Sequence, residues 1–130
     1  MGSVVVGVDG SNESMAALDW AAEFAARFDH SLAIIVIWHL PTPTAHGRTG
    51  FSDADFQTWA DEVIKTASMR VVERNPSIRM DLRVVEGSPG EALVNSSSEA
   101  NLLVVGTRRR LGTVSSYCAH YGSCPVVIVR

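Results

Sequence analysis

The stretch SVVVGVD, residues 3–9, is a short run of β-branched and other apolar residues that ends in an aspartate. It is too short for a typical helix and too uniformly apolar for a strand with one face in water. Such a run is typical of a strand that is covered on both faces, as in a parallel sheet. Residues 31–38 (SLAIIVIW) and 101–106 (NLLVVG) repeat the pattern, so the sequence predicts a sheet built around buried strands.

Helical patterns lie between these strands. Directly after residue 9, Ser11 or Asn12 can cap a helix that has Glu13 in its first turn. The apolar stripe of this helix consists of Ala17, Trp20, Ala21 and Phe24. A second helix can begin at Ser52 with Asp55, and its stripe has helical spacing: Phe56, Trp59, Ala60, Val63, Ile64, Ala67 and Val71. We expect both tryptophans to lie in the core.

The second half of the chain continues the alternation. Residues 79–86 (RMDLRVVE) predict a strand near an edge of the sheet. Ser88 as a cap, followed by Pro89 and by Glu91, is a capping-box signature for a helix that runs to about Ala100. The last two predicted elements are a short helix in TVSSYCAHYG, residues 113–122, and a strand in PVVIVR, residues 125–130.

Strands that alternate with helices predict an α/β fold. We expect one domain, residues 1–130, with a doubly wound, Rossmann-like, five-stranded parallel sheet and helices on both faces. Ligands in such sheets bind beyond the carboxyl ends of the strands. The strand ends of interest are therefore Asp9, Trp38 and Gly106.

The composition narrows the class of protein. The chain has 130 residues, of which 46% are hydrophobic and 19% are charged, and its net charge is −3. This acidic balance argues against a nucleic-acid partner. No apolar run approaches the length of a membrane span, and the amino end does not resemble a signal peptide. Cys118 and Cys124 fit neither a disulfide framework nor a zinc pattern. The composition therefore predicts a cytoplasmic protein that binds no nucleic acid and no membrane.

The stretch GTRRRLGTVSS, residues 106–116, combines two glycines, three arginines and the start of a predicted helix. Glycines let backbone N–H groups approach phosphate oxygens closely. The N-terminus of a helix favours anions because its first N–H groups are unpaired and its dipole end is positive. The stretch is thus either a phosphate site or a basic surface loop.

Four segments resemble the universal stress protein domain: VVVGVDGS (4–11), GSPGEALV (87–94), NLLVVGTR (101–108) and GTVSSYCAHYGSCPVVIVR (112–130). The resemblance covers nearly the whole chain. It implies a sheet of strand order 3-2-1-4-5 and a homodimer formed through the last strand. It also implies ATP binding with a divalent metal, through the pattern G-x2-G-x9-G-[ST].

The chain departs from that pattern. Gly106 matches the first glycine, and Gly112 with Thr113 matches the final pair, but Arg109 stands at the second glycine. Only five residues, 107–111, separate Gly106 from Gly112, fewer than half the number in the pattern. The shortened loop predicts weak or absent ATP binding.

By resemblance, Asp9 and Ile37 line an adenosine pocket, although Asp9 can equally order a turn and Ile37 can equally be core. Thr113 and Ser115 can contact a phosphate or cap the last helix. Arg108, Arg109 and Arg110 can bind phosphate or solvate the loop. The predicted nucleotide site is completed by Gly7, Gly106, Thr107, Gly112 and Val114.

Three functions remain open. The first is a universal stress protein that regulates stress adaptation and carries a weak adenine-nucleotide site. The second is a nucleotide-free dimeric scaffold. The third is a slow ATP-hydrolysing enzyme of the adenine-nucleotide-binding α/β superfamily, although the sequence offers no catalytic group or metal ligand beyond Asp9.

Overall fold

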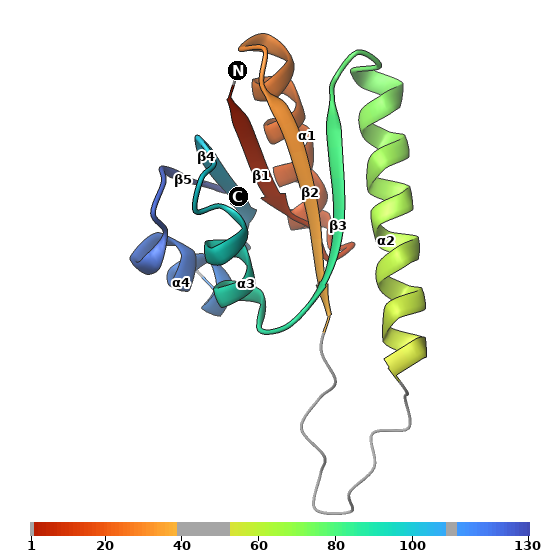
Figure 1. Ribbon diagram of the computed structural model, residues 1–130, viewed down its shortest axis with the longest axis vertical. Helices are drawn as coiled ribbons and strands as arrows, with labels where there is room; N and C mark the ends of the chain where they lie inside the picture. Colours follow the sequence, from red (N-terminus) through yellow and green to blue (C-terminus); the bar gives the residue numbers. More distant parts are fainter. Residues whose placement is uncertain (1, 39–52, 109–111) are drawn as a thin grey trace, which may run out of the picture.

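The computed structural model describes residues 2–38, 53–108 and 112–130. Its strands are β1 (Ser3–Gly7), β2 (Ser31–Trp38), β3 (Met80–Glu86), β4 (Leu102–Gly106) and β5 (Val126–Val129). Its helices are α1 (Asn12–Arg27), α2 (Asp53–Arg74), α3 (Pro89–Ser96) and α4 (Thr113–Tyr121). The strands are parallel in the order β3-β2-β1-β4-β5 (Figure 1). The predicted doubly wound, Rossmann-like α/β fold is therefore confirmed.

The central strands are buried on both faces, as their uniform apolarity predicted. Val4 and Val6 of β1 face a core that includes the buried sides of α1 and α2. Val5 faces the other core, which includes Leu93 of α3 and Cys118 of α4. Figure 1 shows α3 and α4 together on their own side of the sheet. Successive side chains of β1 therefore pack against helices on opposite faces of the sheet.

The ends of the helices follow from local hydrogen bonds. Ser11 caps α1, because its side chain accepts the N–H of Ser14 at 3.2 Å. Ser88 precedes α3 as expected, but its side chain makes no capping hydrogen bond. The helix ends at Ser96 and not near Ala100. The buried hydroxyl of Ser97 donates to the carbonyl of Leu93 at 2.8 Å, a local bond that competes with helix continuation.

The expectation that both tryptophans lie in the core is wrong. Trp20 is 39% exposed and Trp59 is 40% exposed. Small residues, chiefly Ala17, Ala21 and Ala60, occupy the centres of the buried stripes and bring the helices close to the sheet. The large indole rings stand at the margins of these stripes, where Trp20 stacks on Phe24 with ring centroids 5.5 Å apart.

One ion-pair cluster joins the two helices of the larger core. Arg70 of α2 donates to both carboxylate oxygens of Asp19 of α1, at 2.7 and 2.6 Å. Arg74, one turn further along α2, lies 3.0 Å from the same carboxylate. In the part of the chain that the structure describes, no helix combines the length and the apolarity that crossing a membrane requires.

Candidate functional site

A cavity of about 160 Å³ opens beyond the carboxyl ends of β1, β2 and β4. Five of the residues predicted for a nucleotide site line it: Gly7, Asp9, Ile37, Gly106 and Val114. Asp9 and Gly106 therefore share one edge of the sheet, because parallel strands end on the same side. The other lining residues are Val8, Ser11, Ser14, Ile35, Pro89, Leu93 and Val105.

Three helix N-termini converge on this cavity. Ser11 caps α1, Pro89 opens α3, and Val114 lies in the first turn of α4; all three line the cavity. The N-terminal end of each helix carries a partial positive charge from its aligned peptide dipoles. The cavity is therefore favourable for an anion, although the side chains that line it are mostly apolar.

Asp9 is held in a turn by its neighbours. Its Oδ1 accepts the N–H of Ser11 at 2.9 Å, and its own N–H donates to Oγ of Ser14 at 3.2 Å. Partial burial opposes ionisation, but the hydrogen bonds from Ser11 and Ser14 together outweigh it, so the pKa of the Asp9 carboxyl lies below its usual value. At neutral pH the cavity has a fixed acceptor of hydrogen bonds on one wall.

Gly106 and Gly112, the two glycines that match the family pattern, have different surroundings. A Cβ on Gly106 would lie 2.5 Å from the carbonyl carbon of Glu13 and 3.0 Å from the backbone N of Ser14. The packing of α1 on β4 therefore requires glycine at 106, whether or not a ligand binds. A Cβ on Gly112 would meet nothing within 4 Å, and the φ of −85° suits any residue. Gly112 thus leaves open space beside the first turn of α4.

The hydroxyls near α4 are used within the protein. Ser115 is 2% exposed, and its Oγ accepts the N–H of Gly112, the N-cap residue, at 2.9 Å. Thr107 is also buried, and its Oγ1 lies 3.3 Å from the same N–H. Ser115 therefore acts as a capping residue, and neither hydroxyl lines the cavity. Thr113 is exposed at the start of the helix.

The first arginine of the loop faces α1. Nε of Arg108 lies 3.3 Å from a carboxylate oxygen of Glu13, and the Arg108 side chain is 84% exposed. An ion pair in this setting contributes little to stability and can be exchanged for another anion. The predicted roles of Arg109 and Arg110 lie outside the described residues.

Seven of the twelve residues that line the cavity were not predicted as site residues from the sequence. Ser11 and Ser14 come from the first turn of α1, and Leu93 comes from the middle of α3. The pair Ser11 and Ser14, three positions apart and directly after a buried strand, is the signal that could have found the first two. Among the described residues, no three His, Cys, Asp or Glu side chains form a group that could hold a metal ion.

Comparisons with known proteins agree with the fold. The sequence profile of the universal stress protein family matches residues 1–130. Universal stress protein Rv2623 of Mycobacterium tuberculosis is 30% identical over 145 residues, which cover 98% of this chain and 44% of that protein. The chain thus spans about half the length of the curated relatives it matches.

Solved structures of universal stress proteins are also similar to this chain over nearly its whole length. A universal stress protein from Burkholderia pseudomallei is 26% identical, with a TM-score of 0.78 over 98% of this chain and 95% of that one. A universal stress protein solved in complex with cyclic AMP is 29% identical, with a TM-score of 0.78 over 99% and 96% of the two chains. The profile match along the whole sequence places this chain in the universal stress protein family.

Proposed function

We propose that residues 1–130 form one universal stress protein domain that binds an adenine nucleotide with a single phosphate and regulates stress adaptation in the cytoplasm. The observation that carries the proposal is the cavity at the carboxyl edge of the sheet, where apolar walls meet three helix N-termini. That combination suits a ligand with an apolar ring at one end and an anion at the other.

The walls of the cavity match the parts of a nucleoside. Ile37, which is half-buried at the end of β2, offers an apolar surface against which a purine ring can pack. The ionised carboxylate of Asp9 is an acceptor, and it matches the hydroxyl donors of a ribose. The related protein that was solved with cyclic AMP supports this choice of ligand.

The phosphate belongs at the start of α4 in this proposal. The space beside Gly112 admits an oxygen close to the backbone, and the dipole of α4 favours its charge. Arg108 can leave Glu13 to pair with the phosphate, since both partners are near the surface.

ATP fits this site less well than a monophosphate. The cavity of about 160 Å³ is below the roughly 300–1,000 Å³ of typical ligand pockets, so the phosphate of any nucleotide must lie outside it, beside Gly112. The hydroxyl oxygen of Ser115 accepts the N–H of Gly112 at the cap of α4, so it is already engaged and does not contact a phosphate. The five-residue connection from Gly106 to Gly112 also leaves few backbone N–H groups for further phosphates. We therefore expect ATP, with or without a divalent metal, to bind weakly or not at all.

A homodimer through β5 is part of the same proposal. This strand forms one edge of the sheet, and all four of its residues are half-buried. An apolar edge strand exposes unpaired backbone groups that another strand can cover. A second copy of β5, related by a two-fold axis, would cover them.

One observation favours a second candidate, a nucleotide-free dimeric scaffold. Gly106 is explained by the packing of α1, and Ser115 is explained by the cap of α4. These residues would persist in a family member that had lost its ligand. The scaffold and the nucleotide-binding regulator make different predictions about the purified protein.

The test is the analysis of ligand released from that protein. The protein is purified without added nucleotide, denatured and filtered, and the filtrate is separated on an anion-exchange column with detection of adenine absorbance. The proposal predicts a peak at the position of AMP or cyclic AMP, or stoichiometric uptake of cyclic AMP by the emptied protein. A protein that releases nothing and takes up no cyclic AMP is the scaffold.

A further inference from the structure

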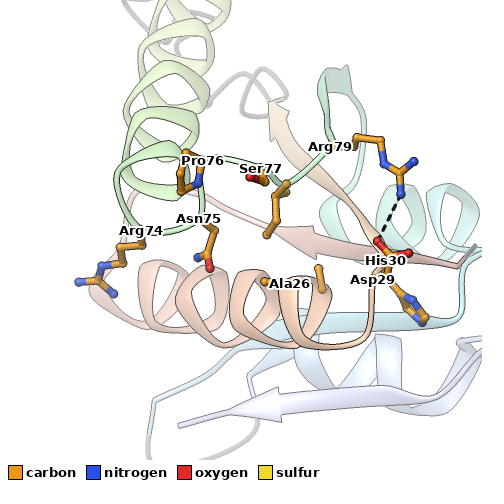
Figure 2. Close-up of a pocket in the computed structure, with 10 residues that line it drawn as sticks. Ala26, Asp29, His30, Arg74, Asn75, Pro76, Ser77 and Arg79 are labelled. Atoms are coloured by element: carbon orange, nitrogen blue, oxygen red, sulfur yellow. Dashed lines mark ion pairs between the residues drawn. The ribbon is translucent and has the colours of Figure 1, made fainter.

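A second groove lies at the opposite end of the sheet, where β2 and β3 begin (Figure 2). Its volume is about 650 Å³, within the range of roughly 300–1,000 Å³ that small-molecule sites occupy. One wall is the last turn of α1 with Asp29, and the other is the connection from α2 to β3, which includes Asn75, Ser77 and Arg79. The groove shares no lining residue with the carboxyl-edge cavity.

The electrostatics of this groove are opposite to those of the nucleotide site. Both α1 and α2 end here, so the negative ends of two helix dipoles face the groove. Asp29 adds a carboxylate whose side chain is 96% exposed. A phosphate or another simple anion could pair with Arg79, but it would also meet these three negative features, so the groove does not favour it.

Asp29 occupies a position where glycine is usual. Its φ is +55°, in the left-handed region, directly after the C-cap Phe28. The N–H of His30 donates to the carbonyl of Ala25 at 2.9 Å, which completes a helix-ending turn of the Schellman type. A carboxylate at this place costs stability twice, through the backbone conformation and through the helix dipole. The nearest charged group across the groove is the one that Asp29 faces.

Asp29 faces Arg79. A carboxylate oxygen of Asp29 lies 3.7 Å from a guanidinium nitrogen of Arg79, whose side chain is 58% exposed (Figure 2). This is a long and solvated pair, and pairs of this kind contribute little to stability. Arg74, the other arginine of the groove, is already bound to Asp19 at 3.0 Å. A simple cation would meet the guanidinium group of Arg79 beside Asp29, so the groove does not favour it either.

We propose that this groove binds a free α-amino acid, with its ammonium group at Asp29 and its carboxylate at Arg79. An α-amino acid carries its two charges a few bonds apart, and it can therefore insert between the partners of a loose ion pair. The ammonium group is favoured by the carboxylate and by the negative end of α1. The carboxylate can accept two parallel N–H bonds from the guanidinium group.

The rest of the groove can take the side chain of the amino acid. Ala26 and Ile78 provide apolar surface, and Asn75 and Ser77 provide hydrogen-bonding groups. Figure 2 shows Ser77 on the connection from α2 to β3 and Asn75 directed toward α1. These apolar and polar lining residues do not favour one amino-acid side chain over another. Recognition therefore depends on the ammonium and carboxylate groups of the ligand.

The test is a titration of the isotope-labelled full chain with the common L-amino acids, one at a time, followed by amide chemical shifts. The best binder is then compared with its N-acetyl derivative, which lacks the positive charge, and with its amide, which lacks the negative charge. We expect shifts at residues 25–30 and 75–79. Each blocked derivative should bind about tenfold more weakly, the change that corresponds to one lost charge-assisted contact.

Two variants assign the charges. Asp29→Asn keeps a residue that tolerates the left-handed conformation, and it should bind the free amino acid and the N-acetyl derivative equally. Arg79→Gln should likewise bind the free amino acid and the amide equally. Arg27→Gln, on the exposed pair with Glu23, is the control and should bind as the unaltered chain does. Absence of binding by every amino acid at millimolar concentration would overturn the proposal, as would equal binding of the blocked derivatives to the unaltered chain or shifts confined to another face.

Discussion

Gly106, at the end of β4, lies directly against the backbone of Glu13 in the first turn of α1. The approach is so close that the space for a Cβ is taken by the Glu13 carbonyl group. This contact sets the position of the α1 N-terminus relative to the carboxyl edge of the sheet. It therefore shapes the cavity that Asp9 and Ser14 also line.

Replacement of Gly106 by alanine should destabilise the fold. The added methyl group must displace backbone and not a flexible side chain, and overpacking of this kind costs roughly 1–3 kcal/mol. Urea unfolding followed by circular dichroism measures the change. Gly112→Ser is the matched control, because its Cβ meets nothing within 4 Å and serine is favoured at an N-cap. Equal unfolding midpoints for Gly106→Ala and the unaltered chain would show that α1 is not held by this contact.

The Asp19 cluster should make stability depend on pH in the acid range. The pKa of the Asp19 carboxyl lies below its ordinary value of 3.8, because Arg70 donates hydrogen bonds to it and both Arg70 and Arg74 place positive charge beside it. Partial burial opposes this effect but does not outweigh it. Because the folded-state pKa is the lower one, the stabilisation is present above the ordinary value and is lost as the pH falls through the folded-state pKa.

The variant Asp19→Asn isolates this contribution. At neutral pH we expect it to be less stable by about 1 kcal/mol, as for a partly exposed ion pair. The difference should disappear at a pH well below 3.8, where both chains carry an uncharged group at this position. Urea midpoints at a series of pH values measure it, and a difference independent of pH would mean that packing and not charge is responsible.

The dimer can be tested through the backbone of β5. The carbonyls of Pro125 and Val129 accept hydrogen bonds from Leu103 of β4 and from Thr107 directly after it. The even-numbered residues of β5 therefore turn their backbone groups outward. Ile128→Pro removes an outward N–H and should give a monomer with the sheet intact. Ile128→Thr loses similar apolar contact but keeps the N–H, so it should remain dimeric. Sedimentation velocity at micromolar concentration decides, and a monomeric unaltered chain would refute the dimer.

The two cysteines should differ in reactivity. Cys118 is fully buried, and burial raises the pKa of its thiol to about 11, so almost no thiolate is present near neutral pH. Cys124 is free and only half-buried. Alkylation with iodoacetamide, read by mass spectrometry of peptides, should modify Cys124 well before Cys118. Simultaneous modification would show that α4 opens more readily than its packing implies.

The fold could be predicted because its signals are local and mutually consistent. Uniformly apolar strands such as residues 31–38 require helices on both faces, and parallel connectivity brings Asp9 and Gly106 to one edge. The strand order itself came from the family resemblance. Periodicity placed Trp20 on an apolar stripe but could not tell the centre of the stripe from its margin, where the ring is partly exposed.

Most of the predicted residues that line the candidate site lie at the end of a strand or directly after it, and Val114 in the first turn of α4 is the exception. Ser14 and Leu93 line the cavity from helices, and their positions depend on how those helices pack. The sequence also could not show why residue 106 is glycine. The sequence suggests a phosphate contact there, whereas the structure shows that the backbone of Glu13 leaves no room for a Cβ. Ser115 fits both readings in the sequence, and its hydrogen bond to Gly112 assigns it to the cap.

Calorimetric titration of the emptied protein with cyclic AMP, AMP and ATP, the last with and without magnesium, tests the central claim most directly. We expect saturable binding of cyclic AMP or AMP at one site per chain and much weaker or absent binding of ATP. We also expect loss of this binding in Gly112→Val, whose branched side chain fills the space beside α4, while Gly106 and the α1 packing stay unchanged. Tight ATP binding, or monophosphate binding that survives Gly112→Val, would contradict the account.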